Sequence, residues 1–198
     1  VLGDGILRHS DLPPIKSFKE NELKILINML EKNINCPLTT SAGRLFDGIS
    51  SLLGIRHKIT YEGQAAMELE FSIREKKEEK PYDFSLKKDE NGGEKFIISW
   101  EEMVLKIVEE FLNKKPVGVM AYKFHITMAE IIKEIAKISK KEKVILSGGC
   151  FQNKFLLEKT KEILEKNGFS VYFNQRIPPN DGGISFGQTV ALNYLKAY

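Results

Sequence analysis

Residues 143–173, KVILSGGCFQNKFLLEKTKEILEKNGFSVYF, contain the pattern that decides the fold. The run 143–147 is short, apolar and rich in branched side chains, which is typical of a buried strand. A Gly-Gly turn follows, residues 150–166 carry apolar side chains at helical spacing, and residues 169–173 form a second strand pattern. Two strands joined by a helix over about 30 residues make a βαβ unit with parallel strands. The sequence therefore predicts an α/β protein.

The rest of the chain adds helices and one hairpin to this unit. Two alternating stretches around Asn91-Gly92-Gly93 predict a β-hairpin. Residues 63–74 can be read in two ways: an alternating pattern in their second half suits a strand, and their composition suits a helix, which we favour. No linker divides the chain, so we expect a single domain over 1–198. The expected helices are 17–34, a segment capped by Thr39 or Thr40 and ended by Gly54, 63–74, 101–113, 117–140 and the C-terminal residues.

Composition excludes several classes of protein. The chain has 198 residues, is 42% hydrophobic and carries a net charge of +3, which is too small to indicate a nucleic-acid or membrane partner. No apolar run approaches the roughly 18 residues of a membrane span. Cys36 and Cys150 are too few for a disulfide framework, so we expect a cytoplasmic protein. Because the chain opens at Val1 without a methionine, we also expect it to be a piece of a longer protein.

Two glycine-rich turns are candidates for the chemistry. Gly148-Gly149 lies between a strand and a helix, where backbone N–H groups and the helix dipole suit a phosphate; a plain tight turn is the alternative. The second turn, Asn180-Asp181-Gly182-Gly183, also precedes a helix. Spacing alone favours Asp181 as the N-cap of that helix, and the alternative is a carboxylate ligand for a cation.

The remaining polar residues give weaker signals. Asp47 is aligned with Arg44 on one helix, so a surface ion pair competes with a role in binding a ribose. His9 and His57 are too scattered to form a metal cluster with His125, which we expect to be a packing residue inside an apolar helix. We expect Cys150 to be a small buried side chain rather than a nucleophile, because no base lies near it in sequence.

Four blocks in order resemble the C-terminal part of the HypF carbamoyltransferases, which mature [NiFe]-hydrogenases. They are SAGRLFDGISSLLGI (41–55), TYEGQAAMELE (60–70), ILSGGCFQNKFLLE (145–158) and RIPPNDGGISFGQ (176–188). The resemblance implies the carbamoyl-adenylate-handling domain related to the TsaD transferases. Its expected fold is one lobe of an actin-like, ribonuclease-H-like ATPase, with a mixed sheet and flanking helices.

The resemblance also implies substrates and partners. The whole protein would use carbamoyl phosphate and ATP, form carbamoyl-adenylate, and pass the carbamoyl group to the C-terminal cysteine of HypE. Neither nucleic acid nor membrane is an expected partner. A non-catalytic lobe that docks HypE, and a TsaD-type transferase acting on tRNA, are the alternatives. The isolated piece is expected to be inactive, and no residue is assigned as catalytic.

Site roles follow from the resemblance motif by motif. Asp47 would hold the nucleotide ribose, and Gly63 would contact the nucleotide although Gln64 replaces the family's second glycine. Gly148-Gly149 would be the phosphate turn. Asn153 falls on the Asn of the family's S-G-G-x-x-x-N motif and would bind the nucleotide beside that turn. The site residues implied for the nucleotide are thus Asp47, Gly63, Gly148, Gly149 and Asn153.

Asp181 would be a ligand of a divalent metal, either Mg, Zn or Fe. The family's other metal ligands are a histidine pair upstream of this region, and the sequence has no such pair. We therefore expect the chain to hold half of the metal ligands and one side of the nucleotide cleft. The turn at Gly148, Asp181 and Asp47 should then converge on one pocket.

Overall fold

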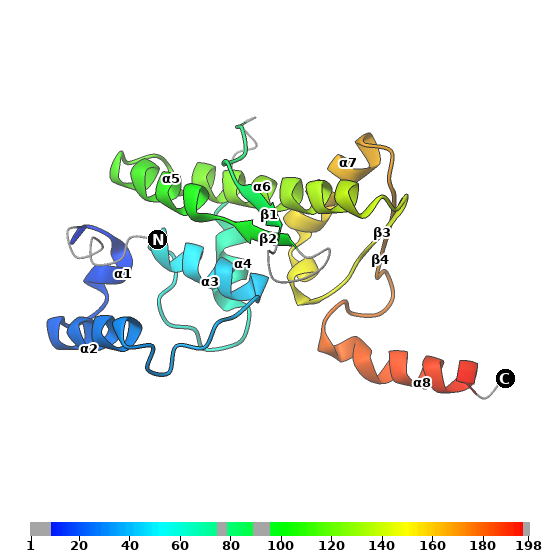
Figure 1. Cartoon of the computed structure of the whole chain (residues 1–198), viewed down its shortest axis with the longest axis horizontal. Coiled ribbons are helices and arrows are strands. Elements are labelled where there is room, and N and C mark those ends of the chain that lie inside the picture. The colour runs from blue at the N-terminus through cyan, green and yellow to red at the C-terminus, as the bar shows by residue number, and fades with distance from the viewer. Residues whose placement is uncertain (1–8, 75–78, 89–95, 196–198) are drawn as a thin grey trace. The chain divides into compact units, whose positions relative to one another are not determined.

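The computed structural model describes residues 9–74, 79–88 and 96–195 (Figure 1). The chain divides into two compact units, Val1–Thr127 and Met128–Tyr198, and the boundary between them in the sequence falls within the long helix α6 (Val117–Ser139). Each unit is described by itself below. Over the described residues, no helix combines the length and the apolar character that crossing a membrane requires.

The first unit contains helices and one antiparallel strand pair. Strands β1 (Ser85–Lys88) and β2 (Phe96–Ser99) pair as a hairpin, as the alternating pattern predicts, while the turn at 91–93 lies outside the described residues. The helices of this unit are α1 (Pro13–Lys16), α2 (Glu20–Glu31), α3 (Ala42–Leu52), α4 (Gln64–Phe71), α5 (Glu101–Leu112) and the first part of α6. The helix expected at 63–74 is thus confirmed, in a shorter form.

Two helix boundaries differ from the sequence expectation. The side chain of Ser41, not Thr39 or Thr40, accepts a hydrogen bond from the Arg44 N–H and caps α3. The expected helix 17–34 is confirmed in a shorter form as α2, which spans Glu20–Glu31, and the short helix α1 precedes it, with Pro13 at its first position. Proline suits a first helical position, since its missing N–H would have no partner there.

The core of the first unit forms where α3, α4, α5 and α6 bury their apolar sides. The Phe46 and Phe124 rings pack edge to face with centroids 4.8 Å apart, and His125 packs against both rings. His125 is fully buried, which confirms it as a packing residue. At the start of α6, Gly118 leaves room for the Ser72 carbonyl, because an added Cβ would lie 2.5 Å from that oxygen.

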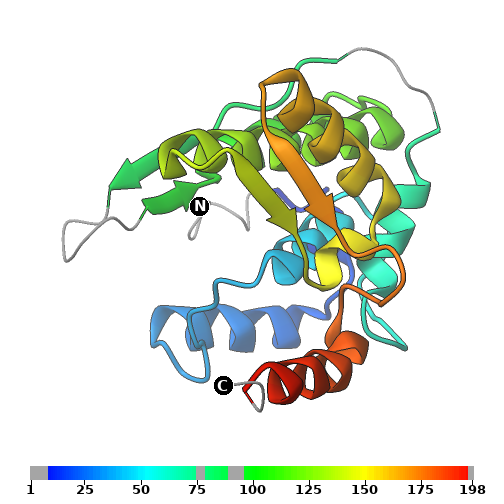
Figure 2. The same ribbon diagram turned by 90° about the vertical axis from the view of Figure 1, so that its right-hand side faces the viewer.

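The second unit is built on the predicted βαβ pattern. Strands β3 (Lys143–Leu146) and β4 (Ser170–Phe173) pair in parallel, with Leu146 opposite Phe173, and Figure 2 shows the two arrows side by side pointing the same way. Between them run a short 3-10 turn, η2 (Gly149–Gln152), and α7 (Lys154–Lys166). Ala136, Leu146 and Leu164 form the buried centre of this unit.

The last elements are a second 3-10 turn, η3 (Asp181–Gly183), and α8 (Ile184–Leu195). The expectation of one mixed sheet is wrong for the described residues, whose strands form two separate two-stranded sheets, one antiparallel and one parallel. Each strand pair forms within its own unit: β1 and β2 pair through a hairpin, and β3 and β4 pair through a βαβ connection. The overall class is α/β with small sheets.

Candidate functional site

A cavity of about 540 Å³ lies in the second unit, at the carboxyl ends of the two parallel strands. Ser147 and Gly148 follow β3 into its wall, and Asn174 follows β4. Open α/β sheets bind ligands outside the carboxyl ends of their strands, because the loops there converge without side chains of the sheet between them. Asp181 and Pro178 complete this side of the wall. The cavity thus brings together two residues that the sequence singles out, Gly148 and Asp181.

Gly148 contributes open space rather than a hydrogen-bond donor. Its φ of 104° and ψ of 159° are accessible almost only to glycine, and no atom lies within 4 Å of where a Cβ would point. Its N–H donates to the Pro179 carbonyl at 2.9 Å, and the neighbouring Gly149 lies beside Asn180. A ligand can therefore approach the backbone at Gly148, but that N–H is already in use.

The helix after this turn starts later than the sequence indicates. Gly149 opens the four-residue turn η2, and α7 begins at Lys154. Asn153 is the N-cap of α7: its Oδ1 accepts a hydrogen bond from the Leu156 N–H at 2.8 Å. The expectation that the Gly-Gly pair lies at the positive end of the helix dipole is therefore wrong. A helix dipole acts mainly at the first turn of the helix, and the first turn of α7 begins after its N-cap, Asn153.

Asp181 is not the N-cap that spacing favours. It lies inside the 3-10 turn η3, whose N-cap is Asn180: the Asn180 Oδ1 accepts from the Gly182 N–H at 3.1 Å and its carbonyl from the Gly183 N–H at 2.9 Å, and α8 begins only at Ile184. The second glycine is needed for packing, because a Cβ on Gly183 would lie 2.7 Å from the Pro178 carbonyl oxygen. This turn leaves the Asp181 side chain exposed at the cavity wall.

The described residues do not fit a metal ion by themselves. Asp181 is a single carboxylate, and nowhere in residues 9–74, 79–88 and 96–195 do three His, Cys, Asp or Glu side chains gather closely enough to hold one. Hard cations such as Mg²⁺ use several oxygen ligands, and zinc sites use at least three protein ligands. A metal at this cavity would need ligands from outside the described chain.

Asp47 and Gly63 belong to the first unit, so the cavity does not gather the whole expected set. Asp47 lies on α3, and Arg44 makes the expected ion pair with it, Nη1 to Oδ2 at 3.4 Å. Gly63 precedes α4 with a φ of 80°, a left-handed conformation that suits glycine. The convergence of Asp47 with Gly148 and Asp181 stays a prediction.

A partly buried polar cluster next to Gly63 was not expected from sequence. The Gln64 amide oxygen accepts from the Thr60 N–H at 2.8 Å, and its nitrogen donates to Glu68 at 3.2 Å. Arg56 binds the same carboxylate through two hydrogen bonds of 2.8 and 2.6 Å. These bonds from Arg56 hold the pKa of Glu68 below its ordinary value. Gln64 therefore fixes the loop before Gly63. Its spacing of four residues from Glu68 was the sequence signal that could have predicted this contact.

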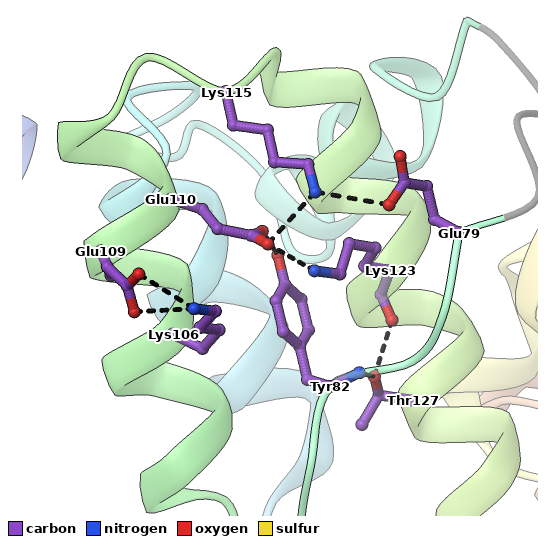
Figure 3. A network of polar contacts seen from close by, with 8 residues as sticks. All are labelled: Glu79, Tyr82, Lys106, Glu109, Glu110, Lys115, Lys123 and Thr127. Atoms are coloured by element: carbon purple, nitrogen blue, oxygen red, sulfur yellow. Dashed lines mark hydrogen bonds and ion pairs between the residues drawn. The ribbon is translucent and has the colours of Figure 1, made fainter.

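A second polar cluster joins α5, α6 and the segment before β1 (Figure 3). The Glu110 carboxylate accepts from Lys123 at 2.5 Å, from Lys115 at 3.1 Å and from the Tyr82 hydroxyl at 2.7 Å. The Lys123 ammonium also lies 4.1 Å from the centre of the Tyr82 ring. Burial and the neighbouring Glu110 raise the pKa of Tyr82 far above its ordinary value. These charges are mutually satisfied, so the cluster acts as a structural clamp.

Comparisons with known proteins agree with the family resemblance. The profile described as "Carbamoyltransferase, Kae1-like Domain, second subdomain" matches residues 6–188. Carbamoyltransferase HypF of Synechocystis is 40% identical over 162 residues, which cover 82% of this chain and 20% of that protein. A probable carbamoyltransferase HypF of Methanocaldococcus jannaschii is 37% identical over 188 residues, with coverage of 91% and 23%.

Solved structures give the same result. A crystal structure of full-length HypF in the phosphate- and nucleotide-bound form matches with a TM-score of 0.85 and 34% identity, over 98% of this chain and 25% of that one. The T. kodakarensis HypF structure matches with a TM-score of 0.78 and 27% identity, over 98% and 26% of the two chains. The chain thus spans about a fifth to a quarter of the length of these relatives. It belongs to the HypF carbamoyltransferase family, within the second subdomain of the Kae1-like domain.

Proposed function

We propose that this chain is the nucleotide-handling part of a HypF carbamoyltransferase. In this proposal the whole protein forms carbamoyl-adenylate from ATP and carbamoyl phosphate. The Kae1-like domain then transfers the carbamoyl group to the C-terminal cysteine of HypE, on the route to the cyanide ligand of [NiFe]-hydrogenases. The cysteine sulfur bonds to the carbamoyl carbon, the bond from that carbon to the AMP oxygen breaks, and the thiol proton leaves to solvent.

The cavity at the carboxyl ends of β3 and β4 is the observation that carries this proposal. The open backbone at Gly148 leaves room for a phosphate group beside the strand. Asn153 follows one turn later, and Asp47 and Gly63 are proposed to bind the ribose and the rest of the nucleotide. Asp181 is proposed to give one carboxylate to a metal whose other ligands come from elsewhere in the protein. The parallel strand pair also supports the finer proposal of an actin-like lobe.

Two observations favour a second candidate, a lobe that docks HypE without catalysis. The Gly148 N–H is already bonded to Pro179, and one carboxylate lines the cavity among the described residues. Such a lobe would keep the fold and bind HypE while binding no nucleotide. The named relatives are HypF carbamoyltransferases, which favours both candidates over a transferase acting on tRNA.

Calorimetric titration of ATP with Mg²⁺ into the full-length protein that contains this sequence tests the proposal. Asp47→Asn and Asp181→Asn should each weaken ATP binding by about tenfold or more. Each substitution removes a carboxylate charge that is proposed to contact the nucleotide or its metal. Glu158→Gln, an exposed carboxylate on α7 paired only at 3.7 Å with Lys154, is the matched control and should bind as the parent does. Unchanged binding in both Asp variants would contradict the nucleotide site.

Asn153 needs a variant that separates its two roles. Asn153→Ala would remove the α7 cap and cost about 1 kcal/mol of stability in addition to any ligand contact. Asn153→Ser keeps a capping oxygen for the Leu156 N–H, so stability should hold while nucleotide affinity falls. Mass analysis of the HypE C-terminal peptide then separates transfer from docking, because a docking lobe would retain HypE without carbamoylating its cysteine.

A further inference from the structure

Two neighbouring residues, Arg56 and His57, tie α3 to α4. On the α3 side, His57 Nδ1 lies 2.9 Å from the hydroxyl oxygen of Ser51, within hydrogen-bond distance. On the α4 side, the Arg56 guanidinium donates to both carboxylate oxygens of Glu68, at 2.8 and 2.6 Å. A two-pronged bond of this kind fixes direction as well as distance, because the guanidinium and the carboxylate are both planar. The segment between the two helices therefore binds each of them through a side chain.

Each of the two helices also carries a residue that is proposed to contact the nucleotide. Asp47 lies on α3 four residues before Ser51, so the two share one side of that helix. Gly63 is the N-cap residue of α4, and its carbonyl accepts from the Met67 N–H at 2.9 Å, so its position follows that helix. The bonds that join α3 to α4 therefore also set the separation of Asp47 and Gly63.

Glu68 also controls the loop that ends at Gly63. The Gln64 amide nitrogen donates to Glu68 at 3.2 Å, and the Gln64 oxygen accepts from the Thr60 N–H at 2.8 Å and from the Thr60 hydroxyl at 3.1 Å. Hydrogen bonds from Arg56 lower the pKa of Glu68, so its carboxylate is ionised at neutral pH. A backbone N–H can only donate and an ionised carboxylate can only accept, so the amide fits in a single orientation. Because Gln64 is 8% exposed, water competes little for these bonds.

We infer that Glu68 is a positioning residue for nucleotide binding. It accepts from Arg56 on one side and from Gln64 on the other, so it fixes α4 against α3 and fixes the loop before α4. It thereby sets the separation of Asp47 and Gly63 without itself contacting the nucleotide. The inference rests on the proposed function in taking Asp47 and Gly63 as nucleotide contacts. A carboxylate that only stabilised the fold would leave the ATP affinity of the folded protein unchanged.

An exchange of two side chains tests this inference in the full-length protein that contains this sequence. Gln64→Glu places two carboxylates at a contact of 3.2 Å, where like charges repel, and should weaken binding of ATP with Mg²⁺ about tenfold. The double variant Gln64→Glu/Glu68→Gln restores the match, because the carboxylate at position 64 accepts both from Thr60 and from the amide at position 68. Its affinity should return to within about threefold of the parent. Glu20→Gln, which removes an exposed pair with Lys24, is the control and should bind as the parent does.

Calorimetric titration compares the binding step that Asp47→Asn weakens. A step that responds to Asp47→Asn but not to Gln64→Glu would overturn the inference alone, whereas the absence of any step that responds to Asp47→Asn would overturn the proposed function and the inference with it. An equal loss in the single and double variants, with thermal unfolding showing both to be folded, would also overturn the inference. If Gln64→Glu does not fold, Arg56→Lys takes its place. Lysine keeps the charge without the two-pronged bond, so binding should weaken about threefold, and parental affinity in that variant would overturn the inference.

Hydrogen exchange measured by mass spectrometry without ATP follows the loop itself. In Gln64→Glu the Thr60 amide should exchange about tenfold faster than in the parent, because its bond to position 64 opens more often. The double variant should return to the parental rate. Weakened ATP binding with unchanged exchange at Thr60 would overturn the inference, because the effect would not act through the loop.

Discussion

Helices α6 and α8 are both rich in apolar residues, although α6 also carries charged side chains and α8 carries none, and they have opposite surroundings. In the part of α6 within the first unit, Lys123, His125 and Thr127 are buried, and each has a hydrogen-bond partner. In α8, large apolar side chains face solvent along the whole helix. The difference teaches that the first unit pairs these buried polar groups within itself, while the second leaves large apolar side chains of α8 exposed.

Loss of the buried Lys123 should be the most damaging change. Lys123→Met leaves the Glu110 carboxylate, 12% exposed, without its shortest partner, and should cost about 3 kcal/mol of unfolding free energy. Lys106→Met removes an exposed pair with Glu109 and should cost less than about 0.5 kcal/mol. Urea denaturation of both variants measures the difference. Equal costs would show that the clamp of Figure 3 is no more stabilising than a surface pair.

Acid should destabilise the first unit through His125. Burial lowers the pKa of His125 to about 4, against a hydrogen bond to the Ala121 carbonyl that acts in the opposite direction. The unfolded state, with a pKa near 6.5, therefore binds more protons between pH 6.5 and 4. Stability is full above pH 6.5 and falls by at most about 3 kcal/mol as the pH drops to 4.

Thermal unfolding followed from pH 7 to pH 4 measures this fall. His125→Gln has no titrating ring, so its stability should change less over the same window even if it is lower throughout. The same slope in parent and variant would assign the pH dependence to other groups.

A methyl group at Gly118 should disturb the packing of α6. Gly118→Ala would bring a Cβ to 2.5 Å from the Ser72 carbonyl and should cost about 2 kcal/mol. Gly48→Ala on α3 meets nothing within 4 Å and should stabilise the chain by up to about 1 kcal/mol, because alanine favours a helix more than glycine does. Denaturation midpoints of the two variants should move in opposite directions.

Ser50 is an exception inside the satisfied unit. Within the described part of the chain its buried hydroxyl has no hydrogen-bond partner, so Ser50→Ala should raise stability by about 1 kcal/mol. Thr127→Val is the contrasting variant, since the Thr127 hydroxyl accepts from the Tyr82 N–H and donates to the Lys123 carbonyl. That variant should lose stability. A destabilising Ser50→Ala would mean that the hydroxyl has a partner such as a bound water.

The smallest effect is expected on α8. Leu195→Asn in residues 1–198 should change the unfolding free energy by less than about 0.5 kcal/mol, because the side chain is 75% exposed. A cost of about 2 kcal/mol, typical of a buried leucine, would show that α8 packs against this chain itself and would remove the contrast with α6.

Local pattern predicts the elements better than their ends. The parallel pair, the hairpin and the helix at 63–74 follow from periodicity and turn residues, which act over a few positions. The caps at Ser41 and Asn153 do not, because several residues in each segment can cap and packing selects one. The clamp of Glu110, Lys123 and Tyr82 joins residues up to 41 positions apart, so no local pattern contains it.

The sequence alone determined the α/β class, the two glycine-rich turns and the family, because short-range spacing and motif order are written in the chain itself. Only the tertiary structure decided that Gly148 and Asp181 meet at one cavity, that Asn180 rather than Asp181 caps its turn, and that α6 is covered while α8 is not. The physical reason is that burial depends on which surfaces meet across long separations. Two helices that are both rich in apolar residues can therefore end in opposite surroundings.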